Sequence, residues 1–160
     1  MARVIHIFIC PEKGQPMQEV REVEAVAGVG LLGDRYALGK GTYSGLPNQS
    51  DKTRSVRDIT IISKANFDRG NRTLAVPFLI SETRRNIVVD NFPLLELIAG
   101  DFQIGEPIFR GVEDCTPCTL PDNMAGKKGF KQAFQKLAGI RAKILYSGII
   151  RVGDILTELD

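Results

Sequence analysis

Short apolar runs separated by turn-forming residues dominate this sequence, and few of them are long enough for a helix. Runs rich in Val, Ile and Phe predict strands, and Gly, Pro, Asn and Asp between them predict turns. The predicted strands cover residues 3–9, 20–26, 58–62, 85–89, 102–105, 107–112, 141–146, 149–152 and 155–159. Many short strands with few helices favour a mainly β fold, either a barrel or a sandwich.

Helical signals are confined to two places. Ser63 is a suitable N-cap for a short helix over residues 64–67. The clearest helical spacing comes later, where Phe130, Ala133, Phe134 and Leu137 recur at helical intervals before Gly139. Residues 121–129 break this pattern, and we expect the phenylalanines to be core side chains.

Length and charge restrict the class of protein. The 160 residues fit a single domain over residues 1–160, and 21 basic against 19 acidic residues are too balanced to indicate a nucleic-acid partner. The apolar start contains His6 and is followed by Pro11, so it resembles a buried strand more than a signal peptide. No apolar run approaches the roughly 18 residues of a membrane span. We expect a cytoplasmic protein without a membrane partner.

Residues 28–51 form a long glycine-rich stretch, which predicts a binding loop. Its start, Gly28-Val29-Gly30-Leu31-Leu32-Gly33, matches a dinucleotide-binding pattern weakly, because no helical pattern follows it. The glycines are better explained by a tight turn with positive φ, or by backbone N–H groups that approach an anion. Asp34 and Arg35, which follow, are either part of such a site or a surface ion pair.

Three cysteines, Cys10, Cys115 and Cys118, are too few and of the wrong parity for a disulfide framework. The Cys115-x-x-Cys118 motif leaves four alternatives. Structural zinc needs further ligands, and only Cys10 and His6 are available. A thioredoxin-like motif needs a helix start in a βαβ unit. The others are a reactive or metal-ligating thiolate on a loop and two inert cysteines. With one histidine, Ser–His hydrolysis is not expected.

Arg84, Arg85 and Asn86 stand beside a predicted strand. Guanidinium forks suit phosphate and carboxylate, and the amide adds a donor and an acceptor. The triplet therefore predicts an anion site, unless it is a solvated strand edge.

Taken in order, these segments resemble the MOSC domain, named after the C-terminal domain of molybdenum-cofactor sulfurase. The resemblance spans residues 3–159. The segments that carry it are Gly30-Leu31-Leu32-Gly33-Asp34-Arg35-Tyr36, Arg84-Arg85-Asn86-Ile87-Val88-Val89, Phe102-Gln103-Ile104-Gly105, Pro117-Cys118, and the closing hairpin from Gly139-Ile140-Arg141-Ala142 to Val152-Gly153-Asp154. Relatives often show Arg-Pro-Asn where this chain has Arg-Arg-Asn, so Arg84 is the matching arginine.

The resemblance implies a closed or partly open β-barrel in which Cys118 ligates molybdenum or carries sulfur as a persulfide. Larger relatives, similar to the mitochondrial amidoxime reducing component, bind molybdopterin and reduce N-hydroxylated compounds. The residues implied to hold the molybdenum cofactor are Arg35, Arg84, Arg85 and Asn86, with Gly33 and Asp34 in the glycine loop. The pattern leaves Cys115 open, either as a second catalytic, resolving thiol or as incidental.

Three functional hypotheses follow. The first is a molybdenum-cofactor protein, a small oxidoreductase whose metal is ligated by Cys118, with a reductase partner and a small-molecule substrate. The second is a sulfur carrier, in which Cys118 receives sulfur from a cysteine desulfurase and passes it to a cofactor or partner. The third is a non-redox anion-binding domain with inert cysteines.

Overall fold

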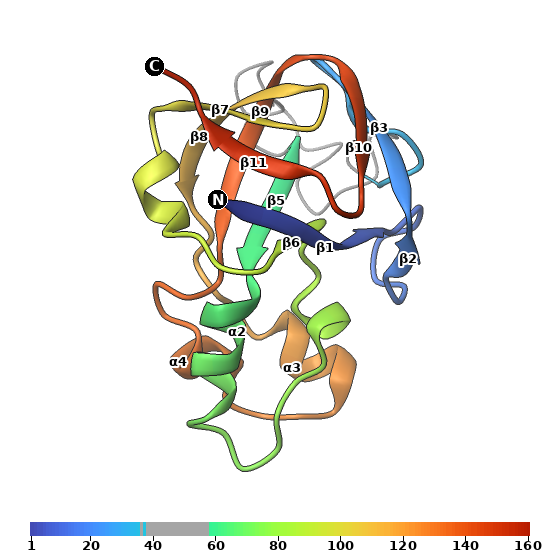
Figure 1. Ribbon diagram of the computed structural model, residues 1–160. Coiled ribbons are helices and arrows are strands. Elements are labelled where there is room, and N and C mark those ends of the chain that lie inside the picture. Colours follow the sequence, from blue (N-terminus) through green and yellow to red (C-terminus); the bar gives the residue numbers. More distant parts are fainter. Residues whose placement is uncertain (36, 38–57) are drawn as a thin grey trace, which may run out of the picture.

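Seven strands form a closed barrel (Figure 1). The computed structural model describes residues 1–35, 37 and 58–160. The ring follows the order β11 (Ile155–Glu158), β7 (Asp101–Ile104), β8 (Ile108–Asp114), β9 (Ile140–Tyr146), β5 (Ile59–Ser63), β6 (Ile87–Val89) and β1 (Ala2–Ile9). Pairing of β1 with β11 closes it, and β2 (Gln18–Val20) extends β1 outside the ring. The expected mainly β barrel is confirmed, in its closed form.

Most neighbouring strands are antiparallel, as short turns between them require. The exception is β5 with β6, which run parallel because the chain between them crosses over through α2 (Lys64–Asn71) and η1 (Ile80–Thr83). A smaller sheet of β10 (Gly148–Arg151), β3 (Glu22–Val26) and β4 (Gly30–Leu31) lies beside the barrel.

The barrel interior is filled by alternate side chains of its strands. In β7 and β8, Phe102 and Phe109 point inward and stack with ring centroids 5.4 Å apart, whereas Arg110 points out to Asp101. β7 and β8 therefore alternate buried and more exposed positions, as half-buried strands should, whereas β5 and β6 are buried throughout. This packing holds the rim of the barrel, from which the site described below is built.

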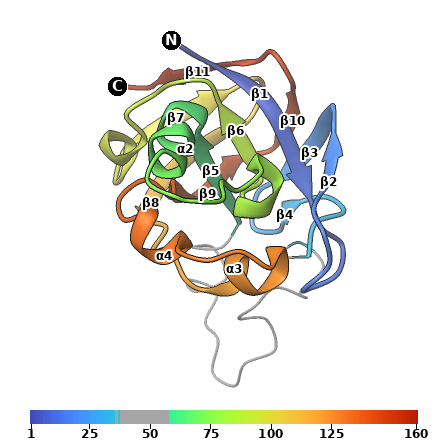
Figure 2. The same ribbon diagram turned by 90° about the horizontal axis from the view of Figure 1, so that it is seen from below.

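Helices gather at one end of the molecule, where they cover a second, aromatic core. Figure 2, seen from that end, shows α2 in front of the strands and α3 (Leu120–Ala125) and α4 (Phe130–Ala133) along one side. A further short helix, η2 (Leu94–Leu97), packs on β8. The aromatic core contains Phe67, Phe78, Phe130 and Phe134. The phenylalanines predicted as core side chains are therefore buried.

The predicted helices differ in length from the observed ones. The helix expected to end at Gly139 is only the four residues of α4, because Phe134 leaves the helical region and Lys136 has φ 62°. In contrast, α3 forms where the sequence predicted a break, since Pro121 lies in its first turn and Gly126 ends it with φ 65°. The predicted α2 is confirmed and extends to Asn71, with Ser63 as its N-cap.

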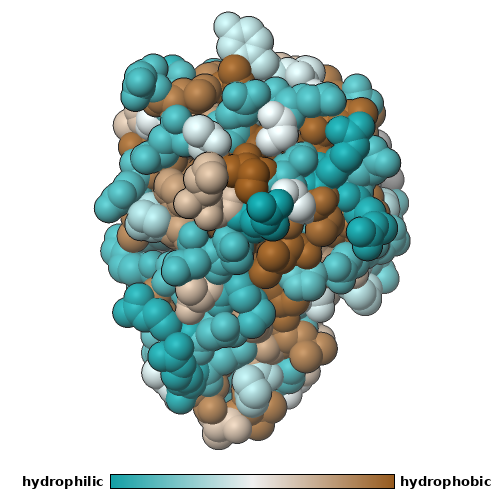
Figure 3. Space-filling view, in the orientation of Figure 1, coloured by the Kyte–Doolittle hydropathy of each residue, from teal (hydrophilic) through white to brown (hydrophobic). Residues whose placement is uncertain are grey.

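The outer surface mixes polar and apolar residues. Figure 3 shows polar residues over most of one face, with apolar residues in a broken band across its middle. None of the helices in the described residues has the length and apolar character needed to cross a membrane.

Candidate functional site

A cavity of about 270 Å³ lies between the barrel and α3. The barrel contributes Thr60 of β5, and α3 contributes Leu120 and Pro121. The complete described lining is Lys13, Arg35, Thr60, Thr83, Arg84, Arg85, Thr116, Cys118, Leu120, Pro121, Phe130 and Arg141. We refer to it as the cationic cavity, because five of these side chains are basic and none of the described ones is acidic.

Cys118 is the one exposed cysteine of the three, and it opens onto the cationic cavity. It lies on the segment between β8 and α3. Two contacts hold that segment: the Cys115 N–H donates to Gly139 O at 2.9 Å, and Pro117 is buried. The thiol is therefore presented to a ligand by a short stretch of chain that is anchored to the barrel.

Arg84 is buried, with 6% of its surface exposed, and adopts a left-handed backbone conformation, φ 62° and ψ 29°. That conformation costs about 1–2 kcal/mol for a residue with a Cβ, and such strain clusters at functional sites. The guanidinium donates to Gln15 O at 2.6 Å and lies 3.7 Å from the Cys10 sulfur. These contacts fix the Arg84 head group at the wall of the cavity.

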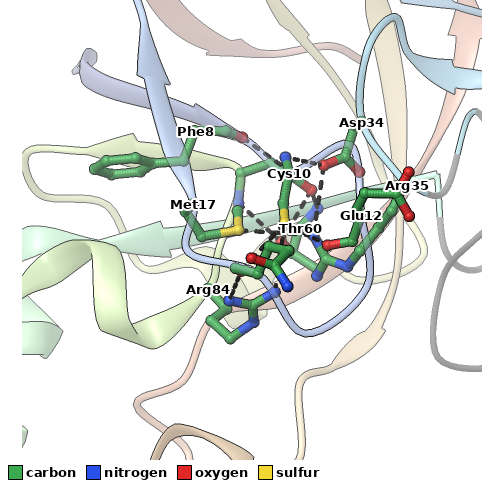
Figure 4. Close-up of polar contacts among 10 residues, drawn as sticks. Phe8, Cys10, Glu12, Met17, Asp34, Arg35, Thr60 and Arg84 are labelled. Carbon is green, nitrogen blue, oxygen red and sulfur yellow. Dashed lines mark hydrogen bonds and ion pairs between the residues drawn. The ribbon is translucent and has the colours of Figure 1, made fainter. Parts of the chain in front are cut away.

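Arg35 is oriented by its neighbour Asp34, as Figure 4 shows. The Arg35 Nη1 lies 3.4 Å from the Asp34 carboxylate and 3.6 Å from the Met17 sulfur. The same carboxylate accepts the Cys10 N–H at 2.8 Å. Asp34 is fully buried and Arg35 is 6% exposed, so the alternative of a surface ion pair is wrong. The segment folds inward because Asp34 satisfies the backbone of Cys10 at the end of β1.

Three further cations line the cavity, one beside Arg84 and two from other segments. Arg85 follows Arg84, and its Nε donates to Ala138 O at 2.7 Å. Arg141 belongs to β9 and pairs with Glu113 at 3.4 Å across the sheet. Lys13 comes from the loop after β1. Sequence reasoning assigned no role to Arg141 or Lys13, although Arg141 lies in a segment that carried the resemblance. Pairing of β9 with β8 places Arg141 near the segment that carries Cys118, whereas Lys13 comes from a distant part of the chain.

Asn86 does not line the cavity. Its buried amide accepts from the Thr60 N–H at 3.1 Å and the Thr60 hydroxyl at 3.2 Å, and donates to Phe8 O at 3.1 Å. It therefore connects β1, β5 and the start of β6 behind the cavity. Through Thr60, which lines the cavity, Asn86 acts as a positioning residue.

Gly33 lies in the turn after β4 with φ 89°, which fits the tight turn that the glycines predict. It does not line the cavity. Most of the predicted binding loop at residues 28–51 lies outside the described residues.

Cys115 is fully buried in the aromatic core, among Phe8, Phe130 and Phe134. Cys10 is also fully buried, and its thiol donates to Glu12 O at 2.8 Å. Within the described ranges, no three His, Cys, Asp or Glu side chains converge as metal ligands.

The charges that line the cationic cavity suit an anion, although Arg35 and Arg141 also pair with Asp34 and Glu113. Five positive side chains around one hollow raise the local concentration of anions. Guanidinium groups bind phosphate or carboxylate oxygens through paired N–H donors. The Thr116 hydroxyl can donate as well, whereas the hydroxyls of Thr60 and Thr83 already donate to Asn86 and to the Ile80 carbonyl. The net charge of the whole chain is only +2, yet five basic side chains gather around this one cavity.

Comparison with known families agrees with this arrangement. Residues 48–157 match the MOSC domain model, which is more than half of the chain. The chain belongs to the MOSC domain family. No match was found in sequence among curated proteins.

Solved structures share the fold of this MOSC domain. The crystal structure of YuaD from Bacillus subtilis is similar with a TM-score of 0.78 and 17% identity, over 97% of this chain and 93% of that one. YiiM from Geobacillus stearothermophilus gives 0.71 and 12%, over 100% and 76%. YiiM from Escherichia coli gives 0.67 and 13%, over 99% and 70%. At these identities the likeness concerns the fold alone.

Proposed function

We propose that this MOSC domain binds the molybdenum cofactor, with the cofactor phosphate in the cationic cavity and the metal on the Cys118 thiolate. The observation that carries the proposal is that the one exposed thiol and five cationic side chains open onto the same cavity. A thiol without cations, or cations without a thiol, would support only half of this assignment.

The donor set fits such a group. A thiolate is a soft ligand suited to a heavy, polarisable metal. Arg35, Arg84, Arg85 and Arg141 supply the forked donors that phosphate prefers. Asp34 positions Arg35, and Asn86 positions Thr60. When bound, the molybdenum cofactor would supply two-electron chemistry, and the protein would provide orientation, charge neutralisation and a metal ligand.

The substrate class that accompanies this proposal is a small N-hydroxylated compound, reduced with electrons from a separate reductase. Phe130, Leu120 and Pro121 give the cavity an apolar wall beside the cations. That wall would exclude water around a small organic substrate near Cys118.

The test is molybdenum and pterin analysis of protein produced in a host that makes the cofactor. We expect near-stoichiometric metal and pterin in the wild type, loss of metal with retained pterin in Cys118→Ser, and reduced pterin in Arg141→Gln. Lys143→Gln is the matched control, because Lys143 is exposed on the same strand and does not line the cavity. Full molybdenum loading of Cys118→Ser would sink the metal-ligand role.

A second candidate function is sulfur transfer, which the exposure of Cys118 favours. Its thiolate would attack the outer sulfur of a cysteine desulfurase persulfide, forming a Cys118 persulfide and leaving the donor as a thiolate. Because Cys115 is buried, its use as a resolving thiol would require the segment to open. A persulfide adds about 32 Da, one sulfur atom, to the peptide that contains Cys118. No such mass after incubation with the desulfurase and cysteine would count against this route.

A further inference from the structure

A second hollow, of about 200 Å³, adjoins the cationic cavity and shares Arg84 and Pro121 with it. Its other described walls are Pro16, Met17, Ser81, Glu82, Met124 and Ala125. They come from the loop between β1 and β2, from η1 and from α3, which are brought together only by the fold. We refer to it as the methionine hollow.

The negative charge on its wall is already compensated. Glu82 accepts from the Lys127 ammonium at 2.6 Å and from the Leu79 N–H at 2.7 Å. Its carboxylate therefore adds little negative potential to the hollow. The walls formed by Pro16, Met17, Met124 and Ala125 are apolar, so the methionine hollow favours an uncharged, apolar group.

Its size indicates what kind of group. An apolar cavity of roughly 150 Å³ is enough to hold one benzene ring. The methionine hollow thus has room for one ring with a small substituent. Thioether sulfurs are polarisable and make favourable contacts with aromatic ring edges. Met17 and Met124 provide two such sulfurs from separate segments.

The methionine hollow is also connected to the ion-binding residues. The Met17 sulfur lies 3.6 Å from Arg35 Nη1, and Arg84 lines both spaces. A ligand ring beside Met17 would therefore place its polar substituent next to the two buried arginines. Together the two spaces have the size of an ordinary small-molecule pocket, roughly 300–1,000 Å³.

We propose that the methionine hollow is the subsite for a single aromatic ring of the substrate, whose polar reacting group extends past Arg84 into the cationic cavity. The proposal rests on the proposed function for the cavity itself, and it adds the substrate class: small single-ring aromatic compounds. The methionine hollow would bind the ring, and Arg35 and Arg84 would orient its polar substituent.

Methyl-labelled methionine gives a direct readout, because the chain has three methionines and Met1 is 97% exposed at the terminus, outside the hollow. The carbon-13 methyl signals are assigned with Met17→Leu and Met124→Leu. We expect benzyl alcohol, a neutral ring probe, to shift the Met17 and Met124 signals saturably and to leave Met1 unchanged. Equal shifts of all three signals, or none, would overturn the subsite.

Calorimetric titration with phenyl phosphate and inorganic phosphate separates the two proposals. We expect phenyl phosphate to bind about tenfold more tightly, from burial of the ring. Met124→Gln should lose at least threefold of the affinity for phenyl phosphate, whereas Asn123→Gln, its exposed neighbour on α3, should not.

The outcomes are distinguishable. If phosphate binds but the ring adds no affinity and shifts neither methyl, the subsite is wrong and the cationic cavity stands. If benzyl alcohol shifts both methyls but neither phosphate compound binds, the cationic cavity is wrong as an anion site and the apolar subsite stands.

Discussion

Single buried polar residues decide the geometry around the cationic cavity. Asn86 ties two barrel strands with three hydrogen bonds, and Asp34 holds both Cys10 and Arg35. Neither side chain lines the cavity. Asn86 and Asp34 therefore matter because they orient Thr60 and Arg35, which do line the cavity.

Replacing Asn86 with alanine should destabilise the protein by about 3 kcal/mol, because the buried Thr60 N–H and Phe8 carbonyl lose a partner. Urea denaturation measures this loss. Asn91→Ala is the control, since Asn91 is exposed, and it should change the free energy of unfolding by less than about 0.5 kcal/mol. A loss below about 1 kcal/mol for Asn86→Ala would mean that water replaces these bonds.

At the scale of secondary-structure elements, the close approach of β9 to β5 depends on the glycine that precedes β9. Gly139 precedes β9 with φ 92°, and a Cβ there would overlap the Ile61 carbonyl of β5. Gly153, between β10 and β11, has φ 98° but open space where a Cβ would lie. The two glycines have the same left-handed backbone conformation, but only at Gly139 would an added Cβ meet a neighbouring strand.

Gly139→Ala should therefore destabilise the protein by about 3 kcal/mol or more, whereas Gly153→Ala should cost about 1–2 kcal/mol from the backbone alone. Thermal unfolding of both variants provides the comparison. Similar melting temperatures would show that β5 and β9 can separate slightly without loss, contrary to the tight contact at Ile61.

Asp90 links the end of β6 to β1. Its carboxylate accepts the Arg3 N–H at 2.9 Å and the Asn91 N–H at 2.7 Å, and these hydrogen bonds lower the pKa of Asp90. A lowered folded-state pKa stabilises the protein above the unfolded-state pKa, about 3.9, and that stabilisation is lost as the pH falls through the folded value.

Asp90→Asn should accordingly be less stable than wild type at pH 7, by no more than about 1 kcal/mol because Asp90 is exposed. The difference should stay constant down to about pH 4 and shrink below it. Urea denaturation at pH 7, 5 and 3 measures it. A difference that grows on acidification would contradict the assignment of the lowered pKa.

For the whole molecule, the fold sorts three chemically identical thiols into different environments. Cys10 and Cys115 are buried in separate places, and Cys118 is exposed at the cavity. This difference makes Cys118 the available ligand or nucleophile and makes the other two packing residues.

Iodoacetamide at neutral pH should thus modify one cysteine per native chain, identified as Cys118 by peptide mass, and three in urea. Phosphate should slow the native reaction if it occupies the cavity beside the thiol. Rapid native labelling of Cys115 would show that its segment opens readily, which would favour a resolving role. An inert Cys118 would favour a non-redox anion-binding domain.

The strands and the mainly β class were predictable, because β-branched runs and turn residues are local signals. Cys118, Arg35, Arg84 and Arg85 were found by their residue types and by resemblance. The short α4 and the unexpected α3 were not predicted: α4 ends where Phe134 leaves the helical region, although the apolar spacing continues, and α3 begins in a segment whose proline predicts a break.

Local sequence patterns set where the chain can extend and turn, and which side chains could bind an anion or a metal. Tertiary contacts place Arg141, Lys13 and Cys118 around one cavity, bury Asp34 and bring Met17 and Met124 to one hollow. These outcomes depend on the pairing of β8 with β9, on closure of β1 against β11 and on the parallel crossover between β5 and β6. Closure brings together residues more than a hundred positions apart, and no local pattern encodes that distance.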